Sequence, residues 1–189
     1  MNDTEIAQSI ASLGTGLGAF LPVLQVVSGI LGLVVFVLGW LDLNSHRHHG
    51  AMMRHSPLSG ENAKRGFTAI IVGVLLLTVP QFIEMIASST ALDPRGDVFG
   101  AMTVQPGDLL TSVKGFTDVI MTILGVVAVM HGLNLLNATA RGEREASFKG
   151  GASFILGGVA AIHYNQIIGA IVHTINLPAV TNIYHLVFP

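Results

Sequence analysis

Histidine is the residue type in this sequence best suited to metal binding or proton transfer, and one group is tightly spaced. His46, His48 and His49 surround Arg47, and His55 lies a few residues further on. Imidazole is a common zinc ligand, so a run of this kind can bind a metal. No carboxylate or thiolate completes a site in this run, and the chain has no Cys. We therefore expect a solvated basic loop that holds neither a metal nor a cofactor.

A second group of polar residues interrupts long apolar stretches toward the C-terminus. His131 lies in one stretch, and His163, Asn165 and Gln166 lie together in the next. Polar side chains at membrane depth either form a path for protons or ions or hydrogen-bond to neighbouring helices. No Asp, Glu, Lys or Arg lies inside these stretches to carry charge. The pattern therefore favours interhelical hydrogen bonds over a conducting path.

The nearest catalytic signature in the sequence involves a serine. Ser153 follows Gly151 and Ala152 on an apolar stretch with histidines nearby, which faintly resembles intramembrane serine proteases. On one helix Ser153 and His163 would lie about 15 Å apart, too far for a nucleophile and its base. The sequence also lacks a phosphate-binding loop, an H-E-x-x-H motif and a G-x-S-x-G nucleophile elbow. We expect a protein that is not an enzyme.

The elements that must position these residues are apolar helices. Charged residues make up 11% of the chain, hydrophobic residues 51%, and the mean hydropathy is +0.66. A soluble domain carries about a quarter charged residues, so this composition indicates a bilayer. A membrane-spanning helix needs roughly 20 apolar residues, and four windows of low charge meet that length. We expect an all-α membrane protein with four transmembrane helices.

Proline, glycine and charge divide the chain into segments. Pro22 restricts the helix that follows it, so the first span is expected at about residues 23–43. The other spans are expected at about 66–83, 119–136 and 150–174. The acidic start does not resemble a secretory leader. The expected division is an N-terminal interfacial segment at 1–22, a first helical hairpin at 23–83, an extracytoplasmic linker at 84–118, a second hairpin at 119–175 and a C-terminal tail at 176–189.

The two hairpins are one sequence pattern that occurs twice. Residues 30–44 align without a gap on residues 123–137, and residues 64–83 align on residues 149–168. Each copy is an apolar segment, a polar basic loop and a second apolar segment. Two copies inserted the same way up form tandem parallel repeats, related by an axis along the membrane normal.

Glycines recur at one spacing in every expected span. Each span carries a pair separated by about two helical turns, so both members lie on one helix face. Small residues let the backbones of membrane helices approach closely. The chain has 22 glycines and some spacings arise by chance, but recurrence in every span favours a packing seam through which subunits assemble. The seam glycines are Gly32, Gly39, Gly66, Gly73, Gly125, Gly132, Gly151 and Gly158.

Positive charge predicts the orientation. All nine Lys and Arg residues except Arg95 and Lys114 lie in the two hairpin loops. Short loops rich in Lys and Arg stay in the cytoplasm, so both termini and the linker are expected in the periplasm of a bacterial inner membrane. The loop cations are suited to anionic phospholipid or to passing DNA, without sequence-specific nucleic acid binding. They are Arg47, Arg54, Lys64, Arg65, Arg141, Arg144 and Lys149.

Short motifs in both hairpins resemble a family of secretion proteins. The second hairpin has K-G at 149–150, I-x-G-G at 155–158 and A-I at 161–162. The first has A-M-M at 51–53 and L-T-V-P at 77–80. Together with the length and the two-hairpin layout, these motifs are similar to the IcmC/DotE family of type IVB secretion systems and its conjugative counterpart, TraQ of IncI-type plasmids. The histidine run departs from the family pattern.

The resemblance implies a small polytopic subunit of a machine that moves DNA or protein between cells, with other subunits of that machine as partners. Two further classes stay open. A conjugative pilin is a two-helix hairpin with a basic loop, and in a filament such loops would line the lumen, but the duplication and the linker at 84–118 count against it. A channel or holin-like pore usually shows intramembrane charge or a continuous polar stripe. A homo-oligomer or filament is expected.

Overall fold

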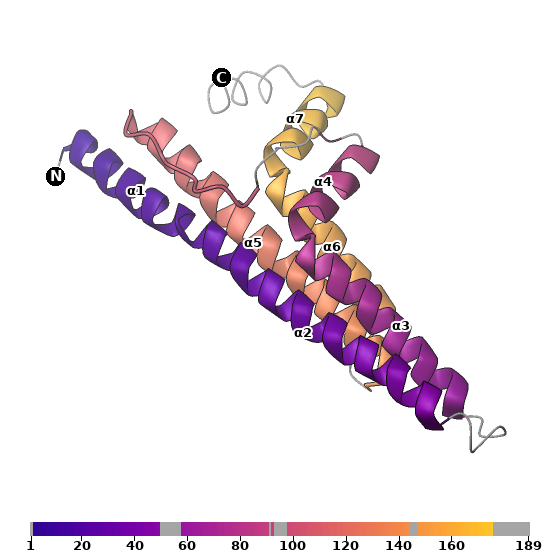
Figure 1. Ribbon diagram of the computed structural model, residues 1–189. Helices are drawn as coiled ribbons and strands as arrows, with labels where there is room; N and C mark the ends of the chain where they lie inside the picture. The colour runs from indigo at the N-terminus through magenta and orange to yellow at the C-terminus, as the bar shows by residue number, and fades with distance from the viewer. Residues whose placement is uncertain (1, 50–57, 91, 93–97, 144–146, 176–189) are drawn as a thin grey trace. The chain divides into compact units, whose positions relative to one another are not determined.

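The structure, a computed structural model, describes residues 2–49, 58–90, 92, 98–143 and 147–175, without the side chains of 45–49, 58–63, 173 and 175. All regular elements in these ranges are α-helices, which confirms the expected all-α class for this part of the chain. Figure 1 shows them in chain order. They are α1 (Asp3–Gly18), α2 (Phe20–His49), α3 (Leu58–Leu77), α4 (Val79–Ser89), α5 (Leu109–Ala140), α6 (Phe148–Ile162) and α7 (Tyr164–Ile175).

The N-terminal helix α1 is followed almost directly by α2. In the first turn of α1 the Glu5 carboxylate accepts a hydrogen bond from the Asn2 backbone N–H at 3.1 Å. Only Ala19 separates the two helices, and Asp3–Asn44 forms a candidate membrane span. The helix that carries the first span therefore begins well before residue 23, and where the membrane begins along it stays a prediction. Pro22 lies in the first turn of α2, where proline is tolerated because those N–H groups have no intrahelical partner.

Two helix pairs are broken where single spans were expected, at 66–83 and 150–174. The chain bends by 90° between α3 and α4 and by 78° between α6 and α7. By length and composition, two helices can cross a membrane alone, Asp3–Asn44 and Leu109–Ala140. Four spans result only if each bent pair counts as one. The described residues therefore support two to four apolar spans.

The linker expected at 84–118 is helical at both ends. α4 continues to Ser89, and α5 begins at Leu109 rather than near residue 119. Asp108 caps α5, because its carboxylate accepts a hydrogen bond from the Thr111 backbone N–H at 3.1 Å. Hydrogen bonds from Thr111, through the side chain first and the backbone second, hold the pKa of Asp108 below its ordinary value.

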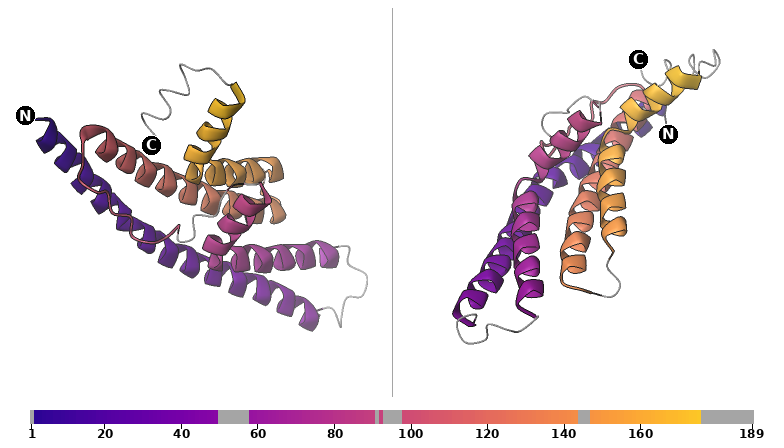
Figure 2. Two further views of the ribbon diagram at one scale, coloured as in Figure 1. Left: turned by 90° about the horizontal axis from the view of Figure 1, so that it is seen from above. Right: turned by 90° about the vertical axis from the view of Figure 1, so that its right-hand side faces the viewer.

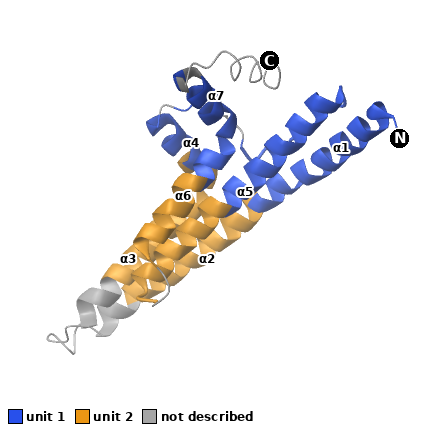
Figure 3. Ribbon diagram, turned by 180° about the vertical axis from the view of Figure 1, so that it is seen from behind, with its two compact units in different colours: residues 1–24, 83–127, 158–189 blue, residues 25–82, 128–157 orange. Residues whose placement is uncertain are grey.

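The chain divides into two compact units, each built from separate stretches (Figure 3). Unit 1 comprises Met1–Leu24, Ile83–Val127 and Gly158–Pro189. In its core α1 packs against Met102, Val104 and the N-terminal half of α5. The side chains of this cluster are Ala11, Val104 and Val119, with Leu17, Met102 and Ile123 packed against them.

Unit 2 comprises Gln25–Phe82 and Ala128–Gly157. It therefore contains most of α2 and α3, the end of α5 and the start of α6. α2 and α3 lie side by side as an antiparallel pair in both views of Figure 2, and so do α5 and α6. Unit 2 is thus built from the loop-proximal parts of both hairpins.

Candidate functional site

The glycines of the first hairpin lie face to face on α2 and α3. A Cβ atom added to Gly32 would lie 2.8 Å from the Gly73 carbonyl oxygen, and one added to Gly73 would lie 2.8 Å from the Gly32 carbonyl oxygen. Gly39 and Gly66 form a second pair, with corresponding distances of 2.8 and 3.0 Å. A Cβ atom has no room this close to another backbone, so the two helices can approach only where both carry glycine.

The second hairpin has the same contacts at the aligned positions. A Cβ atom added to Gly125 would lie 2.5 Å from the Gly158 carbonyl oxygen, and one added to Gly132 would lie 2.7 Å from the Gly151 carbonyl oxygen. The eight seam glycines thus face one another in four pairs, two in each hairpin.

This geometry changes the role that we expected for the glycines. Each contact joins two helices of one hairpin, so the seam glycines are used inside the chain and assembly between chains needs another surface. Gly16, Gly29 and Gly157 differ from them, because an added Cβ atom would meet nothing within 4 Å.

The two helix breaks also fall at aligned positions, Thr78 and His163. The Thr78 backbone N–H and hydroxyl both donate to the Val74 carbonyl, at 3.0 and 2.8 Å. The His163 backbone N–H donates to the Val159 carbonyl at 3.1 Å, and its Nδ1 lies 3.1 Å from the same oxygen. Ser and Thr side chains that bond the carbonyl one turn back often bend helices. Thr78 and His163 share this contact, but Thr122 and Thr139 also make it inside the unbroken α5, so it does not by itself cause a break.

A polar cluster in unit 1 fastens the start of α7 to α5. The Asp118 carboxylate accepts a hydrogen bond from the Tyr164 hydroxyl at 2.8 Å and another from the Asn165 side-chain amide at 2.7 Å, both through Oδ1. All three side chains are partly buried. Gln166 lies next to them and donates its backbone N–H to the His163 carbonyl at 3.0 Å. This arrangement gives Asn165 the interhelical hydrogen bond that its position suggested.

Two of the carboxylates assigned to the linker lie inside helices that continue into apolar segments, which corrects the expectation that these segments carry no acid. Asp118 is inside α5, and Glu84 is inside α4. Both Glu84 carboxylate oxygens are shielded from solvent, and within the described residues they have no hydrogen-bond partner. Both were assigned to the linker because the starts and ends of its helices were not recognised.

The remaining polar candidates make local contacts. His163 is fully buried. His131 is exposed and packs edge-to-face against Phe154, with ring centroids 4.7 Å apart. Ser153 is exposed on α6. No group of three His, Cys, Asp or Glu that could hold a metal occurs among the described residues.

Basic residues at the loop ends of the two hairpins lie near one another in unit 2. An Arg65 guanidinium nitrogen lies 3.5 Å from the position of a Cβ atom added to Gly142, which has φ = 75°. Lys64, Arg141 and Lys149 are exposed. The side chain of Arg47, together with Arg54, Arg144 and the side chains of the histidine run, lies outside the described residues.

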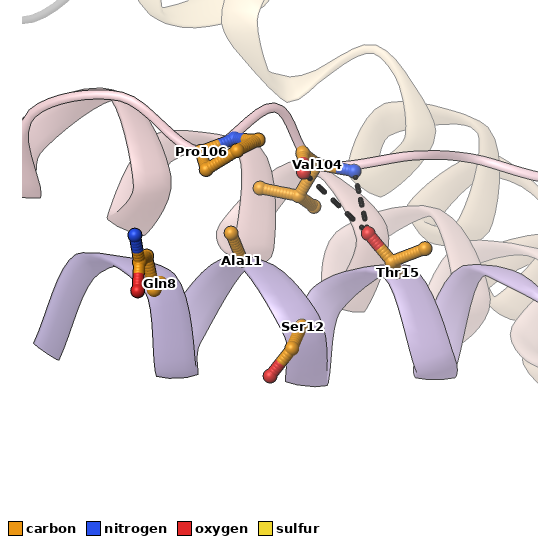
Figure 4. A pocket seen from close by; sticks show the side chains of 6 residues that line it. All are labelled: Gln8, Ala11, Ser12, Thr15, Val104 and Pro106. Carbon is orange, nitrogen blue, oxygen red and sulfur yellow. Dashed lines mark hydrogen bonds between the residues drawn. The ribbon is translucent and has the colours of Figure 1, made fainter. Parts of the chain in front are cut away.

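A shallow groove of about 450 Å³ lies in unit 1 between α1 and residues 104–106 (Figure 4). Thr15 closes one end, where its hydroxyl accepts a hydrogen bond from the Val104 backbone N–H at 3.0 Å. The lining contains no titratable side chain: Gln8, Ala11, Ser12, Thr15, Val104 and Pro106. The groove is therefore a feature of the packing of α1 against residues 104–106.

Sequence reasoning missed Asp118 and Tyr164 as members of the polar cluster. The only sequence signal was the isolation of an acid at the edge of an apolar stretch. Comparison of the chain with protein-family models, curated proteins and solved structures gives no match.

Proposed function

We propose that this chain is a non-enzymatic, polytopic membrane subunit of a type IV secretion or conjugative transfer apparatus. The observation that carries the membrane assignment is the exposure of large apolar side chains along the helices. Trp40 is 60% exposed, Phe67 61% and Leu156 57%. Soluble monomers rarely expose continuous apolar surfaces, whereas lipid solvates them.

The loop ends support insertion of both hairpins the same way up. Arg65 lies at the loop end of the first hairpin and Gly142 at the loop end of the second, and the two are neighbours. Short basic loops stay on the cytoplasmic side, where the inner leaflet carries anionic lipid. The exposed cations Lys64, Arg141 and Lys149 are suited to contact those headgroups.

The non-enzymatic part of the proposal is supported by the contacts of the candidate catalytic groups. His163 is buried against its own helix, and His131 packs on Phe154. The secretion role is supported by the motif resemblance alone, and its cargo is DNA or protein. The glycine seams suit a rigid subunit, because they fix each pair of helices by backbone contact.

Alkaline carbonate extraction followed by a transfer assay tests the proposal. The chain should stay in the membrane pellet, and deletion of its gene from the strain that carries it should abolish transfer of DNA or protein. Wild-type and Gly16→Leu copies should restore transfer, whereas a Gly125→Leu copy should not. Release into the carbonate supernatant would overturn membrane insertion. Unchanged transfer after deletion would overturn the secretion role.

A further inference from the structure

Each hairpin has its own glycine seam, and the two hairpins bury opposite sides of these aligned seams. On α3, the neighbours of Gly73 are Val72, which is 2% exposed, and Val74, which is 44% exposed. On α6, the corresponding neighbours of Gly158 have the reverse pattern, because Gly157 is exposed and Val159 is 2% exposed.

The first helix of each hairpin, α2 or α5, shows the same reversal. Trp40 follows Gly39 on α2 and is 60% exposed, whereas the aligned Leu133 on α5 is fully buried. Leu33 is 55% exposed, whereas the aligned Val126 is fully buried. Val37 is 45% exposed, whereas the aligned Met130 is 8% exposed. The asymmetry therefore extends along the helices.

Helix geometry places these residues on two distinct flanks of each hairpin. At about 100° per residue, Val72 and Val74 lie on either side of Gly73, and Trp40 lies about 100° to one side of Gly39. In an antiparallel pair, residues that follow the seam glycine lie on one flank, and those that precede it lie on the other. We name these the following flank (Leu33, Val37, Trp40, Val74, Leu77 and their aligned residues) and the preceding flank (Ala69, Val72, Leu76 and their aligned residues).

On α3 the first hairpin buries its preceding flank, whereas on α2 Leu31 and Leu38 are 37% and 43% exposed. The second hairpin buries its following flank on both helices, through Val126, Leu133, Val159 and Ile162. In unit 2, Val72 and Leu76 are covered on one hairpin, and Met130 and Leu133 are covered on the other. Unit 2 consists only of segments of these two hairpins, drawn in orange in Figure 3. The simplest packing that covers both sets is preceding flank against following flank. Such a contact between unlike surfaces is heterologous.

We propose that a second copy of this chain repeats this contact between molecules, with the exposed following flank of one copy packed on the exposed preceding flank of the next. The proposal deepens the proposed function and depends on insertion of both copies the same way up in a membrane. The exposed following flank of the first hairpin aligns with the buried following flank of the second. The exposed preceding flank of the second hairpin aligns with the buried preceding flank of the first. Heterologous contacts close into rings or continue as filaments, according to the rotation between neighbours.

The side chains on the two exposed flanks suit this packing. The following flank of the first hairpin is apolar and large, with Trp40 as its most prominent side chain. The preceding flank of the second hairpin has Gly157, where an added Cβ atom would meet nothing within 4 Å, beside Phe154, which is 45% exposed. Small residues next to large ones let membrane helices pack closely, so the two flanks complement each other in size.

Thiol crosslinking in native membranes tests the contact, because the chain has no Cys of its own. Trp40→Cys and Gly157→Cys are made as separate single variants, co-expressed and treated with a short bifunctional maleimide. The expected product is a crosslinked dimer when both variants are present. Each variant alone should give little dimer, since a heterologous contact does not bring like positions together.

Val34→Cys with Leu156→Cys is the matched control pair. Val34 is 49% exposed and the aligned Val127 is 46% exposed; Leu156 is 57% exposed and the aligned Ile71 is 44% exposed. These positions are exposed in both hairpins, so lipid should cover them and no dimer should form. Equal crosslinking of this pair, or strong self-crosslinking of Trp40→Cys alone, would overturn the proposal.

The proposal would also be overturned if Trp40→Cys and Gly157→Cys both stay in the membrane after carbonate extraction but give no dimer. Lipid or a different subunit would then cover these flanks. That result leaves membrane insertion standing, whereas loss of both variants from the membrane fraction counts against the proposed function. Co-purification of an untagged copy with a tagged copy gives an independent measure of association that introduces no thiol, and Trp40→Phe is the conservative variant. Co-purification of the two copies should persist with Trp40→Phe and be lost with Trp40→Asp at wild-type membrane abundance.

Discussion

The two helix breaks differ in what holds them. Both Thr78 and His163 direct a side chain to the carbonyl oxygen one turn back, and both keep the backbone hydrogen bond to that carbonyl. After Thr78 comes Pro80, which has no N–H to donate and clashes with the preceding turn. After His163 come Tyr164 and Asn165, which instead donate to Asp118 on α5.

The difference shows two ways of bending an aligned helix. The first break has a local cause in the sequence, because proline inside a helix removes one backbone hydrogen bond and clashes with the carbonyl group of the preceding turn. The second depends on a residue far away in the sequence, and its bend should weaken when that residue changes. The two aligned helix pairs thus share a bend but differ in the contacts that hold it.

The seam glycines should matter equally in both hairpins. Gly73→Leu and Gly125→Leu place a side chain where a Cβ atom would lie 2.6 Å from the Phe36 backbone nitrogen or 2.5 Å from the Gly158 carbonyl oxygen. We expect each to lower the free energy of unfolding in detergent by about 3 kcal/mol, measured by circular dichroism in denaturant. Gly16→Leu is the control, since Gly16 has open space. A loss in only one hairpin would show that the two seams are not equivalent.

Replacing proline should straighten only the first break. Pro80→Ala restores an N–H donor, and proline inside a helix costs about 3 kcal/mol, so the α3 and α4 segments should join. Spin labels at Ile71 and Met85, read by pulsed electron resonance, should separate to about 21 Å, the length of a straight helix between them. Pro22→Ala is the control, because Asp3–Asn44 passes Pro22 as one candidate span and has no such bend to straighten. An unchanged label distance would mean that packing, rather than proline, sets the bend.

Removing the acid should loosen only the second break. Asp118→Ala deletes the acceptor of two hydrogen bonds, and we expect the opening free energy of the first turn of α7 to fall by about 2 kcal/mol. Amide hydrogen exchange around Gln166 and Ile167 measures this change. Tyr164→Phe should give a smaller effect, because it removes one donor. An equal loss of amide protection in α4 would contradict the view that the two breaks are held independently of each other.

The smallest expected effect is on the cap of α5. The pKa of Asp108 is lowered by hydrogen bonds from Thr111, so its stabilising contribution is present above the ordinary Asp pKa and is lost as pH falls through the folded pKa. Hydrogen exchange at Ser112 and Val113 should therefore speed up below about pH 4, after correction for the intrinsic rate. Asp108→Asn should remove this pH dependence. Helices without an acidic first turn, such as α2, should not show it.

The sequence allowed prediction of the helical class and of the glycine positions that lie against backbone, because both follow from composition and periodicity. Pro80 could have indicated the first break, but it was placed inside the span at 66–83. The start of α5 could have been predicted, since Asp108 three residues before Thr111 is a cap signal.

The second break and its polar cluster could not be predicted in the same way. His163 carries no intrinsic helix-breaking signal, and Asp118 meets Tyr164 only after α5 and α7 have packed in unit 1. Which flank each hairpin buries is likewise set by tertiary packing. Aligned residues such as Trp40 and Leu133 are both apolar, so the sequence does not show which of them is exposed. Whether the basic loops face the cytoplasm stays a prediction.

Trp40 is the single tryptophan of the chain, and its exposed indole makes the protein its own optical reporter. Emission from this one fluorophore records whether acyl chains or a neighbouring polypeptide surround the first hairpin. Brominated lipids should quench it in dilute vesicles, and the quenching should diminish as the amount of protein per vesicle rises.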